Sequence, residues 1–76
     1  MVKAENIVRN GDEVTFDCFE EGDRERSHHV VFDVNTWEIL NGENKSNLFI
    51  LHAIAKLEKI LEEKGELPKK AISMCY

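Results

Sequence analysis

The stretch NLFILHAIAKLEKIL, residues 47–61, decides the fold class, because it predicts one long helix in a chain whose first half shows strand patterns. Ten of its fifteen residues are apolar, and it contains neither Gly nor Pro. At about 100° per residue, one broad apolar sector contains Ile50, Ala53, Ile54, Leu57, Ile60 and Leu61, with Phe49 at its edge. We expect this sector to form the core by covering one face of a sheet.

Residues on both sides of this stretch predict a helix over about 46–64. Ser46 or Asn44 is a suitable N-cap, since either side chain can accept a backbone N–H of the first helical turn. Gly65 is expected just after the last helical residue, and Pro68 follows three residues later.

The first half of the helix carries apolar residues that the core does not need. Leu48, Leu51 and Ala55 fall roughly opposite the core sector and are flanked by His52. Either the 66–76 tail or the 41–45 loop of the same chain covers them, or another molecule does. In the second case the sequence suggests a homodimer across a two-fold axis, or a different partner protein. Full burial of a Leu is worth roughly 1.5–3 kcal/mol, which suits a modest contact.

Residues 13–20, EVTFDCFE, show the period-two alternation of a strand with one buried face. Val14, Phe16 and Cys18 point to one side, and Thr15, Asp17 and Phe19 point to the other. The turn signal NGD at 10–12 joins this strand to an expected strand at 2–9, which predicts a hairpin.

A third strand is expected at 28–34, HHVVFDV, after a polar connection at 21–27. Asn35 and Thr36 favour a turn before a short fourth strand at 37–40; the alternative is one long strand through to Leu40. We expect Trp37 to close the core against the helix. The tail, 65–76, either adds a short strand or lies as an arm.

These patterns predict a single α+β domain over residues 1–76. Its two layers are a mostly antiparallel sheet of three to five strands, within residues 2–40, and one long C-terminal helix.

The distribution of charge counts against some classes of partner. The net charge is −5, with −7 from residues 1–43 and +2 from residues 44–76. Nucleic-acid and anionic-membrane binding need clustered Lys and Arg, so the acidic first half counts against both. A weak nucleic-acid alternative remains, through a sheet face with Trp37 and the arginines Arg9, Arg24 and Arg26, or through Lys69 and Lys70 in the tail.

The compartment expected from the sequence is the cytoplasm. Residues 1–10, MVKAENIVRN, lack the apolar run of a secretory signal, and no stretch has the length of a membrane-spanning helix. Cys18 and Cys75 form no CxxC motif and are expected to be thiols.

Three residues form the best candidate metal site. Cys18, His28 and His29 lie on neighbouring expected strands, although adjacent residues on one strand point to opposite faces. No CxxC, HxxxH or HxH spacing supports this alternative, a metal or small-ligand domain.

The sequence shows no catalytic constellation. It contains no Gly-rich phosphate loop and no GxSxG motif, and its many acidic residues, Asp17 and Glu20 among them, are expected at the surface. The favoured function is therefore a non-catalytic protein-interaction module without a cofactor. Its expected contact residues are Leu48, Leu51, His52 and Ala55.

Overall fold

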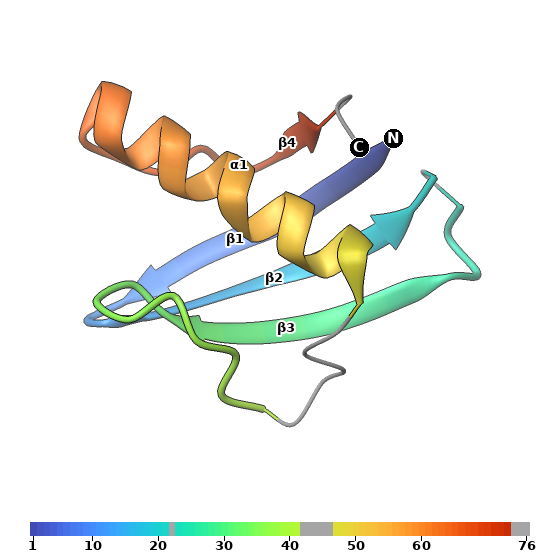
Figure 1. The fold of residues 1–76 in the computed structure, drawn as a ribbon, viewed down its shortest axis with the longest axis horizontal. Helices are drawn as coiled ribbons and strands as arrows, with labels where there is room; N and C mark the ends of the chain where they lie inside the picture. Colours follow the sequence, from blue (N-terminus) through green and yellow to red (C-terminus); the bar gives the residue numbers. More distant parts are fainter. Residues whose placement is uncertain (22, 42–46, 74–76) are drawn as a thin grey trace.

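The computed structural model describes residues 1–21, 23–41 and 47–73, which form an antiparallel sheet and one helix. The strands are β1 (Val2–Asn10), β2 (Glu13–Glu20), β3 (Ser27–Asp33) and β4 (Ala71–Ser73), and the helix is α1 (Leu48–Lys64). The strand order is β3-β2-β1-β4, and α1 lies across one face of the sheet (Figure 1). The predicted α+β fold is confirmed.

The centre of the sheet is the predicted hairpin of β1 and β2. Its turn uses the positive φ of Gly11, 66°, which glycine adopts without steric cost. A β-bulge interrupts the β1 register between Glu5 and Val8, and Asn6 adopts a φ of 54° there. The short C-terminal strand is also confirmed: β4 pairs with the outer edge of β1, with Ala71 opposite Ala4.

The helix begins at Leu48, two residues after the predicted start at about residue 46. Its N-cap is Asn47, whose Oδ1 accepts the backbone N–H groups of Phe49 at 2.9 Å and Ile50 at 3.3 Å. The prediction of Ser46 or Asn44 as the cap is therefore wrong, and both of those residues lie outside the described part of the chain. The other end is as predicted, because Gly65 adopts a φ of 77° and donates its N–H to Leu61.

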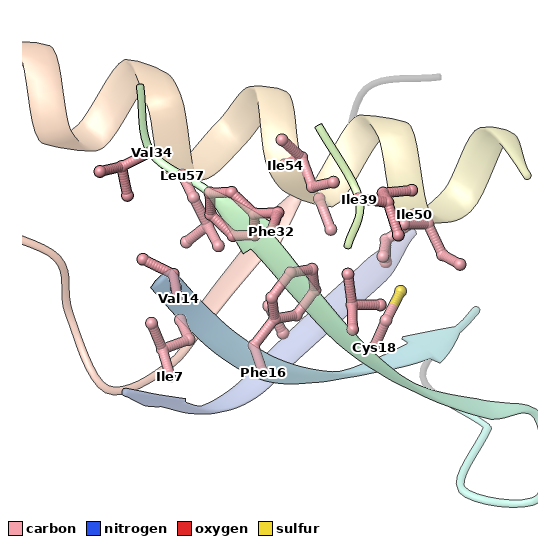
Figure 2. Close-up of a cluster of buried hydrophobic side chains, with 14 residues drawn as sticks. Ile7, Val14, Phe16, Cys18, Phe32, Val34, Ile39, Ile50, Ile54 and Leu57 are labelled. Carbon is pink, nitrogen blue, oxygen red and sulfur yellow. The ribbon is translucent and has the colours of Figure 1, made fainter. Parts of the chain in front are cut away.

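The core lies between α1 and the sheet (Figure 2). The predicted inward row of β2, Val14, Phe16 and Cys18, is fully buried. Four residues of the predicted helix sector are buried with it: Ile50, Ala53, Ile54 and Leu57. Ile60 and Leu61 are only partly buried, since they belong to the last turns of the helix.

The turn predicted at Asn35 and Thr36 follows β3, so the alternative of a single strand through Leu40 is wrong, and the predicted strand at 37–40 is reduced to one bridge. The side-chain carboxylate of Asp33 accepts the N–H of Asn35 at 2.7 Å. The backbone carbonyl of Asp33 accepts the N–H of Trp37 at 2.6 Å. These bonds close a turn, and the chain returns along β3 with one bridge, from Ile39 to Phe32.

Trp37 closes the core as predicted, although from a turn and not from a strand. Its ring stacks on Phe32 with the ring centres 5.4 Å apart. The backbone of Trp37 adopts a φ of 61°, which is rare for a bulky residue. The turn thus holds this ring against the core in a strained conformation.

Candidate interaction surface

Two leucines on the first turns of α1 are exposed. The exposed fraction is 67% for Leu48 and 42% for Leu51, and Ala55 on the same side is also exposed. The neighbouring His52 is partly buried. The sequence therefore identified correctly which helix residues stay outside the core.

Trp37 extends this apolar area beyond the helix. A shallow groove of about 270 Å³ separates the turn from α1, and its lining is Trp37, Glu38, Ile39 and Leu51. We call the area formed by Trp37, Leu48, Leu51, His52 and Ala55 the Leu51 surface. Sequence reasoning missed the contribution of Trp37, because the turn that brings it to Leu51 depends on backbone hydrogen bonds.

The described part of the tail does not cover the Leu51 surface. It follows the other side of the helix, where residues 66–72 border a groove with Lys56 and Ile60, and it then pairs with β1 as β4. The remaining candidates for a cover within the chain, residues 42–46 and 74–76, lie outside the described residues.

The three candidate metal ligands occupy two faces of the sheet. Cys18 and His28 are register partners on β2 and β3, and both belong to the face toward α1. His29 lies on the opposite face, where its Nδ1 is 2.9 Å from an oxygen of Asp17. Within the described ranges, no three His, Cys, Asp or Glu side chains converge as metal ligands.

A buried carboxylate that the sequence placed at the surface ties the helix to the sheet. Glu20 is 8% exposed, accepts a hydrogen bond from Arg26 at 2.8 Å, and lies 2.5 Å from Nε2 of His28. Asn47, the helix cap, donates from Nδ2 to the same carboxylate at 3.3 Å. One signal in the sequence could have found Glu20, because it continues the inward row of Phe16 and Cys18.

These hydrogen bonds set the protonation of two acids. Contact with His28 first, and then with Asn47, holds the pKa of Glu20 below its ordinary value of 4.5. On the other face, hydrogen bonds from Asn6 first, and then with His29, hold the pKa of Asp17 below 3.8. Both side chains are anions at neutral pH. Glu20 links β2 to β3 and to the helix cap, and Asp17 links β2 to β1 and β3.

Acid is therefore expected to destabilise the fold through Glu20. A carboxyl with a lowered folded-state pKa contributes stability above its unfolded pKa, and that stability is lost as pH falls through the folded value. Urea unfolding should show a free energy that falls progressively below about pH 4.5. Glu20→Gln should flatten this dependence and lower stability at pH 7 by about 1–3 kcal/mol.

The matched control is Glu62→Gln, which changes an exposed carboxyl of α1 in the same way. It should keep the pH profile of the wild type. Equal profiles for Glu20→Gln and the wild type would contradict the assignment of Glu20 as an acid-sensitive link between helix and sheet.

The arginines that sequence reasoning considered for nucleic acid are bound within the chain. The guanidinium of Arg24 pairs with Glu5 at 2.9 Å and lies 4.7 Å from the centre of the Phe19 ring. Arg26 pairs with Glu20. Trp37 packs on the core and not on the open sheet face, so the stacking platform of that alternative is not assembled there.

Comparison of the chain with known protein families, curated proteins and solved structures found no match. Among the described residues, no helix has the length and apolar character needed to cross a membrane.

Proposed function

We propose that this chain is a non-catalytic protein-interaction module that binds its partner through the Leu51 surface. The observation that carries the proposal is the exposure of Leu48 and Leu51, 67% and 42%, on one helix beside Trp37. Large apolar side chains that cluster at the surface around a tryptophan are typical of protein contacts.

The free energy of burying apolar side chains favours partner binding at the Leu51 surface. Burying a whole Leu is worth roughly 1.5–3 kcal/mol, so the two exposed leucines leave part of that free energy available for association. Trp37 is already held by the Phe32 ring, and a pre-ordered aromatic side chain loses little conformational entropy when a partner covers it.

We also propose that the module works in the cytoplasm, as the sequence leads us to expect. A domain of 76 residues has a thin core, and partner binding is one of the ways in which such small domains gain stability.

The proposal predicts that Leu51→Asp abolishes partner capture while the fold survives. Tagged wild type and variant would be incubated with an extract of the source cells, and retained proteins would be quantified by mass spectrometry. The retained proteins, further copies of the chain included, should fall at least tenfold for Leu51→Asp, since the buried charge costs well over 1.4 kcal/mol.

Val8→Asp is the matched control for this experiment. Val8 is 58% exposed and follows the buried Ile7, so it lies on the sheet face away from the helix. It should retain the wild-type set of proteins. The proposal would be contradicted if both variants retained that set, or if both lost it equally while circular dichroism showed them folded.

A further inference from the structure

We propose that the partner of the Leu51 surface is a second copy of this chain. In the inferred dimer the two α1 helices run antiparallel across a two-fold axis that passes between Leu51 and His52. This inference rests on the proposed function, and it adds the identity of the partner and the geometry of the contact. Three properties of the surface support it: shape, charge and extent.

The shape of the helix face is self-complementary about that axis. An antiparallel pair centred between Leu51 and His52 places Leu48 of each copy opposite Ala55 of the other. The large side chain thus faces the small one at both ends of the contact, as close packing of two helices requires. Leu51 lies beside the axis, at the groove that Trp37 and Ile39 line.

The charges are complementary under the same symmetry. Residues 48–55 contain no charged side chain, so the two helices bring no like charges together at the centre of the contact, and the acid Glu38 lies beside it in the lining of the groove. The first turn of α1 itself contains no acidic residue, and the Glu20 carboxylate of β2 reaches this positive end of the helix dipole from the core side, through the cap residue Asn47. The antiparallel arrangement brings Glu58 of one copy towards the helix N-terminus of the other, where a carboxylate is favoured. A parallel pair would place like helix ends together.

The extent of the surface suits a weak dimer. A standard interface buries about 800 Å² of each partner. That is about one sixth of the 4822 Å² that this chain exposes. The helix of 17 residues spans roughly 26 Å of a molecule whose longest dimension is 29 Å. A contact along the outer face of α1 therefore approaches the standard area only at its low end, and we expect a weak dimer.

Sedimentation equilibrium on the purified chain tests the partner. The wild type should reach twice the mass of one chain at high micromolar concentration. Leu51→Asp should stay at the mass of one chain, and Val8→Asp should behave as the wild type. Leu48→Gln gives a milder change at a 67% exposed position, and it should weaken the dimer while leaving the fold intact. Glu58→Lys should weaken the dimer several-fold at low salt and less at high salt.

Disulfide cross-linking tests the geometry, with Cys75→Ser as the background so that Cys75 cannot contribute. A mixture of Leu48→Cys and Ala55→Cys chains, distinguished by a tag, should form the mixed disulfide. Leu48→Cys alone should cross-link far less, because its two copies lie about 10 Å apart along the helix axes. Preferential linkage of Leu48→Cys to itself would indicate parallel helices and would overturn the proposed geometry.

A wild type that stays at the mass of one chain at every concentration would overturn this inference. If that monomer still captured another protein through Leu51, the proposed function would stand with a different partner. If it captured nothing through Leu51, both would fail. A wild-type dimer that persists unchanged in folded Leu51→Asp would place the contact elsewhere and would also overturn the inference.

Discussion

Phe32→Ala is expected to lower the free energy of unfolding by about 3–5 kcal/mol, the largest effect of any single change considered for this chain. The Phe32 side chain is fully buried. It packs edge-on against Phe16, with ring centres 5.9 Å apart, and stacks on Trp37. Removing it leaves a cavity and releases Trp37, so both layers of the domain lose packing.

Val31→Ala is the matched control, since Val31 precedes Phe32 on β3 and is only partly buried. It should cost less than about 1.5 kcal/mol in the same urea titration. Similar losses for the two variants would contradict the assignment of Phe32 to the centre of the core.

The second large effect concerns Trp37, where the stabilities of two replacement variants should follow the reverse of the usual order for Ala and Gly. Trp37→Ala should cost about 2–3 kcal/mol, because the lost ring is only partly buried. Trp37→Gly should be more stable than Trp37→Ala by about 1 kcal/mol, since a φ of 61° strains every side chain that has a Cβ.

Lys59 provides the comparison, because it is exposed in the middle of α1. There Lys59→Ala should be more stable than Lys59→Gly by about 1 kcal/mol, the normal order for a helix. Thermal unfolding of the four variants gives both orders. The same order at both positions would show that the turn does not hold Trp37 at positive φ.

Much of the fold follows from periodicity alone. The alternation of Val14, Phe16 and Cys18 identified the buried face of β2, and the helical period identified Ile50 and Leu57 as core residues. Both patterns were readable because a half-buried strand and a half-buried helix each repeat their apolar residues at a fixed spacing.

The parts that sequence reasoning predicted wrongly depend on hydrogen bonds that no period records. After the predicted turn at Asn35 and Thr36, residues 37–40 form one bridge and not a strand, and the helix cap moves to Asn47. Glu20 was treated as a surface acid because of its charge, although its position in the alternation of β2 pointed inward. Its carboxylate is bound by Arg26, which directly precedes β3, and by His28 on β3.

Only part of the candidate site could be predicted from the sequence. Leu48, Leu51, His52 and Ala55 could be assigned to the outer helix face from the helical period, whereas Trp37 could not be joined to them without the turn. Among the candidate metal ligands, strand alternation already separated His28 from His29, and the structure places them on opposite faces of the sheet.

The central claim is that Leu51 serves association and not the core of its own chain, and the concentration dependence of thermal unfolding tests it most directly. When only folded chains dimerise, the melting temperature rises with the protein concentration. The melting temperature of the wild type should therefore rise with protein concentration, while that of Leu51→Asp should stay constant. The claim would be contradicted if the melting temperatures of both proteins were independent of concentration and Leu51→Asp were strongly destabilised. That result would assign Leu51 to the core of its own chain.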